Sequence, residues 1–423
     1  MKVSLDPSEK AQSQAMSPGS IKGPRPMALH LSNALSIWRE APAGAERLLA
    51  GNGVWHPDVN GDMTALTECL ADLDNHPRFL KAVEERANNR AENFLNGINR
   101  YLQNTYTRPE SDAQPCLKVG SCELFDFGGD GQPILLVPSL VNPHYVLDLM
   151  PGRSVAQYLR RQGYRPFLVK WFDPGEEELT FGLSDFILKR AKPMLEYICK
   201  LAGRACPVLG YCMGGTLMTG LAARAGDLVS SLALVAAPWD FASEVPHAGR
   251  RYAHVMAELL DRLPEGMPVP TDMMQVFFTS VDPTLSDRKF RRFAELDGNS
   301  EEAQFFVALE TWANTGAPLA RNAAEECIRA WYLNNEPGRG VWHVGGKPVN
   351  LADIRCPVWI AAPKKDRLVP QDSAFAMAKY LPNATTHDPG AGHVGMMVGS
   401  RAEAGLWAPL VGWLKNQEAA CAA

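Results

Sequence analysis

The chain has 423 residues, 46% of them hydrophobic and 21% charged, so it holds ample material for a buried globular core. Its formal net charge of −5 provides no basic footprint, which argues against nucleic-acid binding. Nine scattered cysteines without a C-x-x-C pair predict reduced thiols in a cytoplasm rather than a metal site. No apolar run reaches the ~18 residues that a transmembrane segment needs.

The first quarter of the chain is predicted to be helical behind a disordered tail. Residues 1–26 are rich in Ser, Pro, Gly, Lys and Gln and predict that tail. From 27 to 115 apolar residues recur at helical spacing, and Asn75 and Pro77 mark one helix start. This N-terminal helical region shows no plausible catalytic cluster, so we expect it to brace the rest of the chain or to offer an interaction surface.

Strand and helix patterns alternate in two later stretches, 116–241 and 355–418. An antiparallel strand pair is expected first, around 117–127. The run 133–137 is continuously apolar, as in a strand buried on both faces. The other predicted strands are 167–169, 208–211, 229–237, 357–361 and 384–386. Helices are predicted between them, at 154–162, 183–201, 372–380 and 404–414. This alternation predicts a doubly wound, mostly parallel sheet.

The alternation stops between the two stretches, and residues 242–354 predict a separate helical cap inserted into the sheet domain. Met273, Met274, Phe277 and Phe278 form two adjacent pairs one helical turn apart, so they would give one helix an apolar face. We expect this face to pack over a pocket. A cap of this kind would shield the site from water.

Residues 208–225 predict a strand, a sharp turn and a helix with Cys212 at the turn. The glycines at 210 and 214 complete a G-x-C-x-G pattern, which is the spacing of a nucleophile elbow with Cys in place of Ser. A Cβ at either glycine would collide with the neighbouring strand or helix. The following helix N-terminus favours a thiolate, so Cys212 is the candidate nucleophile.

A thiol nucleophile needs a base, and the base needs an acid that orients it. In an α/β-hydrolase fold these follow in the order nucleophile, acid, base, each on a loop after a strand. Asp366 directly follows the strand at 357–361, and His393 lies in a glycine-rich loop after the last strand. They are therefore the candidate acid and base, with Asp240 and His387 as the competing choices.

The developing oxyanion needs two backbone amides. One is expected from Met213, the residue after the nucleophile, and the other from Leu140 or Val141 in the loop after the strand at 133–137. Basic residues surround the candidate acid; they are Lys364, Lys365 and Arg367. They are explained either as solvated surface charges or as groups that attract a phosphate-bearing substrate.

With these motifs in place, the chain resembles the polyhydroxyalkanoate synthases, Cys-dependent relatives of the α/β-hydrolases. The segments that carry the resemblance are 141–149, 153–154, 168–171, Leu209–Thr216, 238–241, 346–351, 353–358, 366–370 and 392–395. The similarity covers roughly residues 115–415. It departs at Arg367, where the synthases usually carry His.

The resemblance implies acyl transfer from an (R)-3-hydroxyacyl-CoA to the thiol of Cys212 and then to the hydroxyl of a growing polyester. It implies no cofactor, because the CoA thioester is the substrate. A polymer granule surface is a further partner that it implies, so we expect a cytoplasmic, granule-associated protein; a homodimer is compatible with this interpretation.

Two other interpretations of the sequence stay open. A thioesterase or polymer depolymerase of the same fold would pass the acyl group to water. A non-enzymatic granule-surface protein would retain the fold with its triad misaligned.

Overall fold

A computed structural model of the chain describes residues 23–52, 60–171, 173–243 and 248–422. The predicted tail at 1–26 lies outside the described residues apart from its last turn, 23–26. Within the described ranges, no helix combines the length and the apolarity that crossing a bilayer requires.

An eight-stranded sheet forms the centre of the molecule, and its strands run in the order β1-β2-β4-β3-β5-β6-β9-β10. The strands are β1 (Gln114–Val119), β2 (Cys122–Asp126), β3 (Gln132–Val137), β4 (Tyr164–Lys170), β5 (Cys206–Tyr211), β6 (Val229–Val235), β9 (Val358–Ala361) and β10 (Ala384–His387). The predicted antiparallel pair is β1 with β2, and the strands from β4 to β10 pair in parallel. The sheet is therefore doubly wound and mostly parallel, as the sequence predicted.

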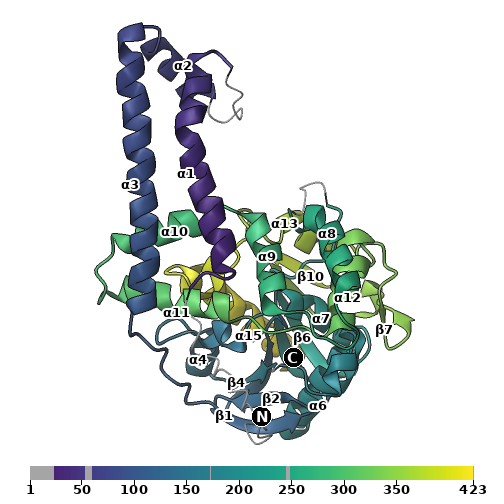
Figure 1. Cartoon of the computed structure of the whole chain (residues 1–423). Coiled ribbons are helices and arrows are strands. Elements are labelled where there is room, and N and C mark those ends of the chain that lie inside the picture. Colours follow the sequence, from purple (N-terminus) through teal and green to yellow (C-terminus); the bar gives the residue numbers. More distant parts are fainter. Residues whose placement is uncertain (1–22, 53–59, 172, 244–247, 423) are drawn as a thin grey trace, which may run out of the picture.

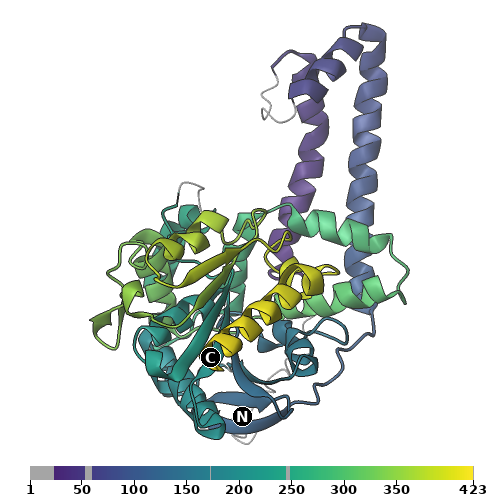
Figure 2. The same cartoon turned by 180° about the vertical axis from the view of Figure 1, so that it is seen from behind.

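Both faces of the sheet are buried because its strands alternate between two hydrophobic clusters. In β3, Leu135 and Val137 belong to one cluster, while Ile134 and Leu136 belong to the other. The helices that cover the first face are α6 (Lys192–Ala202), α7 (Met213–Ala222) and α13 (Gln371–Phe375). Those on the second face are α4 (Val155–Arg161), the π-helix η10 (Glu403–Trp407) and α15 (Ala408–Ala422). Figure 2 shows α15, in yellow, against the sheet.

The cap lies between β6 and β9. It consists of α8 (Ala248–Arg262), α9 (Thr271–Val281), α10 (Leu285–Ala294), α11 (Glu301–Thr315), α12 (Arg321–Glu325), the π-helix η7 (Glu326–Leu333) and the hairpin β7–β8 (His343–Val344 and Lys347–Pro348). We expected a separate cap, but α8, α9, α12 and η7 share one hydrophobic cluster with the sheet helices. The cap is thus continuous with the core.

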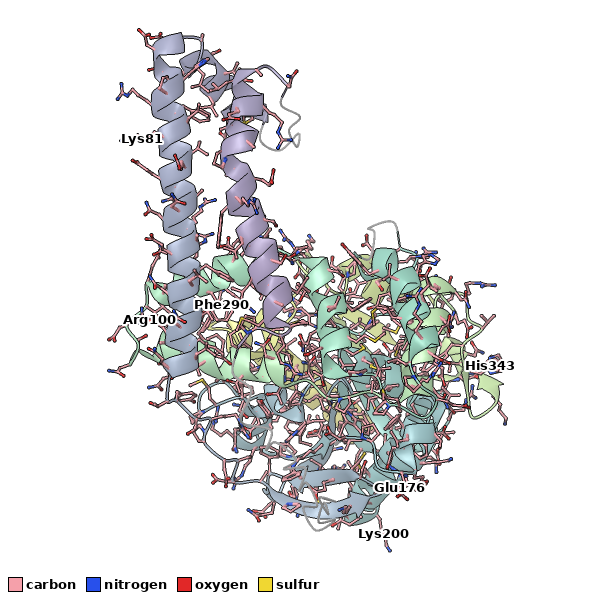
Figure 3. The ribbon with its side chains drawn as sticks, in the orientation of Figure 1. Lys81, Arg100, Glu176, Lys200, Phe290 and His343 are labelled. Atoms are coloured by element: carbon pink, nitrogen blue, oxygen red, sulfur yellow. The ribbon has the colours of Figure 1, made fainter. Side chains whose placement is uncertain are left out.

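The N-terminal region forms a long hairpin that projects from the globular part (Figure 1). Its elements are α1 (Met27–Leu49), α2 (Asn60–Cys69) and α3 (His76–Gln103). The predicted helix start is confirmed, because α3 begins at His76 with Asn75 as its N-cap. At its base, Phe94 and Tyr101 of α3 pack edge-on against Phe290 of α10. Arg100 lies beside Phe290 there (Figure 3).

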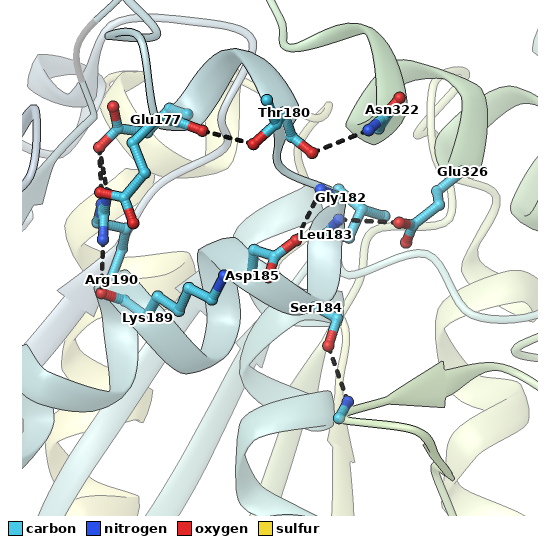
Figure 4. A network of polar contacts seen from close by, with 12 residues as sticks. Glu177, Thr180, Gly182, Leu183, Ser184, Asp185, Lys189, Arg190, Asn322 and Glu326 are labelled. Carbon is cyan, nitrogen blue, oxygen red and sulfur yellow. Dashed lines mark hydrogen bonds and ion pairs between the residues drawn. The ribbon is translucent and has the colours of Figure 1, made fainter.

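Polar contacts attach the cap to a core segment that precedes α6 (Figure 4). Asn322 donates a hydrogen bond of 2.8 Å to the Thr180 carbonyl, and the Leu183 N–H donates one of 3.2 Å to Glu326 Oε1. The Gly345 N–H donates to Ser184 Oγ at 2.8 Å. Burial raises the pKa of Glu326 to about 7, and the nearby Asp185 and Glu336 carboxylates add to this although the Leu183 N–H opposes it.

We predict that Glu326→Gln stabilises the protein above pH 7. The glutamine keeps an oxygen for the Leu183 N–H but removes a charge that is costly to bury. Because the folded state holds the Glu326 proton up to about pH 7, wild-type stability falls as pH rises from the ordinary glutamate range to that value. The variant should lack this pH-dependent decrease in the free energy of unfolding, which is on the order of 1–3 kcal/mol.

Urea unfolding at pH 5 and pH 8 measures this difference. Glu302→Gln, which changes an exposed carboxylate of α11, is the matched control and should leave the pH dependence unchanged. Equal pH dependence in Glu326→Gln and the wild type would show that Glu326 is ionised throughout.

Candidate active site

Cys212 occupies a sharp turn between β5 and α7. Its backbone has φ 54° and ψ −129°, a conformation that side-chain-bearing residues rarely adopt. The Cys212 N–H donates a 2.8 Å hydrogen bond to the Val235 carbonyl, and its own carbonyl accepts one of 2.9 Å from Gly215. These bonds fix a strained turn that places the thiol between the sheet edge and the N-terminus of α7.

The two flanking glycines are required by close backbone approach. A Cβ on Gly210 would lie 2.5 Å from Gly215 Cα, and one on Gly214 would lie 2.4 Å from the Val137 carbonyl oxygen. Both neighbours are backbone atoms that cannot swing aside. The G-x-C-x-G spacing therefore follows from how tightly α7 is packed against β3 and β5.

Asp366 and His393 lie together although they come from separate loops. Asp366 follows β9, and His393 lies just before the short helix α14 (Gly395–Val398). Their side chains meet through His393 Nδ1 and Asp366 Oδ2, 2.7 Å apart. The other carboxylate oxygen accepts from the Leu368 and Val369 N–H groups, each at 2.9 Å. The carboxylate is fully buried and held from both sides.

The Asp366 contact fixes the histidine tautomer. Because a carboxylate oxygen accepts the bond, Nδ1 carries the proton and Nε2 is left for the thiol. Cys212 lies beside the ring, within its hydrogen-bonding and electrostatic range. Burial opposes protonation of the ring, but the Asp366 carboxylate and the Cys212 sulfur outweigh it and raise the pKa of His393 well above its ordinary value. The arrangement therefore suits His393 to accept and hold a proton.

The competing residues have other partners. His387 Nε2 lies 2.7 Å from the Gly405 carbonyl, and the His387 ring stacks on Trp359. Asp240 accepts from the side chain of Asn335 at 2.8 Å. The structure thus brings Asp366 and His393, rather than the competing Asp240 and His387, to Cys212. Their catalytic roles stay a prediction.

Of the three residues predicted to supply oxyanion amides, only Val141 is among the described residues that line the cavity. Met213 is the first residue of α7, directly after Cys212. Val141 lines the same cavity as Cys212, and its N–H points to Ser139 Oγ at 3.4 Å. Leu140 is buried in the core and is not among the described residues that line the cavity. Val141 thus borders the cavity, but its N–H donates to Ser139 Oγ and must leave that partner before it can bind an oxyanion.

A cavity of about 460 Å³ opens over Cys212 and His393. The cap contributes one wall through Gln275, Phe278 and Thr279 of α9. The prediction that four apolar residues of α9 face the pocket was wrong in part. Met274 and Phe277 turn into the core cluster, and of the predicted four only Phe278 lines the cavity. The apolar residues of α9 are thus divided between the core and the cavity wall. A four-residue sequence pattern does not show which residue faces which.

The basic residues around the candidate acid Asp366 differ in their contacts. Lys364 and Lys365 are exposed, and Lys365 borders the cavity. Arg367 also borders it, and its Nη1 lies 2.7 Å from Oδ2 of Asp282, the C-cap residue of α9. Arg367 therefore ties the loop of the candidate acid to the cap.

Sequence reasoning missed one wall of the cavity. His30, from the first turn of α1, lines it together with the cap residues Lys289 and Asn314. The N-terminal region held no recognisable motif at His30, so no sequence signal pointed to it. Among the described residues, no group of three or more His, Cys, Asp or Glu side chains has a metal-binding arrangement.

Comparison with known proteins identifies the family of the chain. A family model described as the alpha/beta hydrolase fold matches residues 132–400, so the chain belongs to that family. Among curated proteins, it is 27% identical to the poly(3-hydroxyalkanoate) polymerase subunit PhaC of Haloferax mediterranei, over 67% of this chain and 59% of that protein. The PhaC of Haloarcula marismortui is 28% identical, over 71% of this chain and 64% of that protein.

The chain thus spans about three fifths of the length of these two curated relatives. Among solved structures, a thermophilic esterase from Thermogutta terrifontis aligns with a TM-score of 0.44 at 16% identity, over 74% of this chain and 99% of that one.

Proposed function

We propose that this protein is a polyhydroxyalkanoate synthase-like acyltransferase that polymerises (R)-3-hydroxyacyl-CoA. The observation that carries the proposal is a cysteine, in place of serine, at a strained elbow beside a buried His–Asp pair. The similarity to PhaC polymerases supports the substrate class.

In the proposed reaction, His393 takes the proton of Cys212 and the thiolate attacks the thioester carbonyl. The Met213 and Val141 N–H groups would stabilise the resulting oxyanion. When the carbonyl re-forms, the bond to CoA sulfur breaks and CoA leaves with the proton from His393. Asp366 keeps His393 in the required tautomer and stabilises its charged form.

In the elongation step an alcohol takes the place of the thiol, and His393 again accepts the proton. His393 takes the proton of the incoming hydroxyl, whose oxygen attacks the acyl-Cys212 thioester, and the thiolate leaves. Exchange of one thioester for another is nearly balanced in energy, so cysteine suits repeated loading. The cavity under the cap would favour an alcohol over water at this step.

Incubation with 3-hydroxybutyryl-CoA tests the proposal. CoA release with insoluble polyester is the expected result. CoA release with free 3-hydroxybutyrate would instead make the protein a thioesterase or depolymerase of the same fold. Absence of CoA release would favour a non-enzymatic role at the surface of a polymer granule. The proposed synthase would also have that surface as a partner.

A further inference from the structure

The loop that carries His393 has open space around its glycines. Gly390 and Gly392 precede the histidine, and a Cβ built on either would meet no atom beyond its chain neighbours within 4 Å. The elbow of Cys212 differs, because its flanking glycines are pressed against backbone. A general base must stay within hydrogen-bond reach of the proton that it takes. His393 therefore needs contacts from outside its own loop to keep its ring beside Cys212.

Besides Cys212, two residues outside the loop supply such contacts. Asp366 bonds to the imidazole at Nδ1. The second residue is Tyr211, which ends β5 and directly precedes Cys212. The Tyr211 hydroxyl donates a 3.3 Å hydrogen bond to the His393 backbone carbonyl, across 182 positions of the sequence. The Tyr211 ring also lies against the imidazole, with the ring centroids 5.4 Å apart and an angle of 36° between the ring planes.

Burial limits what Tyr211 can do. The residue is only 2% exposed, so almost none of it can meet a substrate. Burial raises the pKa of Tyr211 well above its ordinary value, and Cys212 and Asp366 act in the same direction. The hydroxyl therefore keeps its proton and stays a donor. Because Tyr211 and Cys212 are neighbours in the chain, the same strand end holds both the nucleophile and the backbone of its base.

We propose that Tyr211 is a positioning residue that holds His393 within reach of the Cys212 thiol. Its hydroxyl fixes the backbone of the base and its ring limits the tilt of the imidazole, while Asp366 fixes the tautomer. This rests on the proposed function for the role of His393 as the base. The residue before the nucleophile thus becomes a fourth member of the proposed site, and it acts through His393 rather than on the substrate.

Alkylation of Cys212 by iodoacetamide tests this proposal without a substrate. The exposed Cys69 is the internal reference, and mass spectrometry measures both cysteines of the full chain at pH 7. The thiolate is the form that reacts, and a base beside Cys212 makes it available. Tyr211→Phe removes only the hydroxyl and should lower the ratio of Cys212 to Cys69 alkylation about threefold, because a bond of 3.3 Å is a weak one. Tyr211→Leu, which also removes the ring, should lower the ratio further.

The His393→Gln background separates positioning from a general structural effect. Added to that variant, Tyr211→Phe should cause no further loss, because the residue through which it acts is gone. Tyr158→Phe, at a buried tyrosine of α4 that packs on Trp407, is the matched control and should keep the wild-type ratio. At pH 10, where a thiol ionises without a base, Tyr211→Phe and the wild type should react alike. That result excludes a change in access to the thiol.

Melting temperatures establish that each variant is folded. An unchanged ratio in Tyr211→Phe, a loss of the same size in the His393→Gln background, or a loss that persists at pH 10 would overturn the proposal. Because alkylation needs no thioester, these results are independent of CoA release. A protein that shows the expected ratios but releases no CoA from 3-hydroxybutyryl-CoA would refute the proposed function alone.

Discussion

Cys212→Ala should abolish CoA release from 3-hydroxybutyryl-CoA, with a loss of roughly four orders of magnitude or more. No other group beside His393 is placed to form the acyl intermediate, as far as the described residues show. The fold should persist, because the change removes one half-buried sulfur and leaves the glycine-lined turn intact. CoA release measured with a thiol reagent, alongside a thermal melt, gives both answers.

Cys212→Ser refines this prediction, and it should also be strongly impaired. A serine hydroxyl is far harder to ionise than a thiol, so the paired His393 cannot generate the nucleophile as readily. Cys356→Ala, a half-buried cysteine outside the cavity, serves as the control and should behave as the wild type. Retained CoA release in Cys212→Ala would place the nucleophile elsewhere.

His393→Gln should lower the rate of acylation by about two to four orders of magnitude. Glutamine can still contact Asp366 but cannot take a proton from Cys212. The remaining activity should rise with pH, because the thiol must then ionise without a base beside it. Pre-steady-state CoA release between pH 6 and 9 measures both effects.

The structure provides a matched control in His387→Gln. His387 lies on the neighbouring strand end and bonds to the Gly405 carbonyl, so its replacement should leave the pH profile of acylation unchanged. If the His387 variant lost activity and the His393 variant kept it, the assignment of the base would be reversed.

Local chemistry made much of the sheet and the site predictable. The apolar run in β3 indicated burial on both faces, and the structure divides its residues between two clusters. The glycines around Cys212 indicated close packing, and their missing Cβ atoms would meet backbone. Asp366 and His393 were placed by chain order and by their position on loops after predicted strands, because carboxyl ends of parallel strands share one edge of the sheet.

Long-range packing was not predictable in the same way. Which residues of α9 face the cavity depends on how the helix is rotated against α8 and η7, and Met274 and Phe277 are apolar in either arrangement. His30 reaches the cavity only because α1 docks on cap helices far along the chain. The salt bridge between Arg367 and Asp282 likewise joins residues whose charges have no common local pattern.

The shared packing of α3 with α10 has a consequence for how the chain folds during synthesis. Arg100 bonds to the Ala294 carbonyl, 194 residues later in the sequence. The N-terminal hairpin leaves the ribosome before the cap, so Phe94 and Tyr101 lack their contacts with Phe290 until the cap has been made. Until then, the face of α3 that α10 covers stays exposed on the nascent chain. The cavity-wall residue His30 is likewise synthesised before the cap, and it reaches its place only once the cap residues that it contacts have been made.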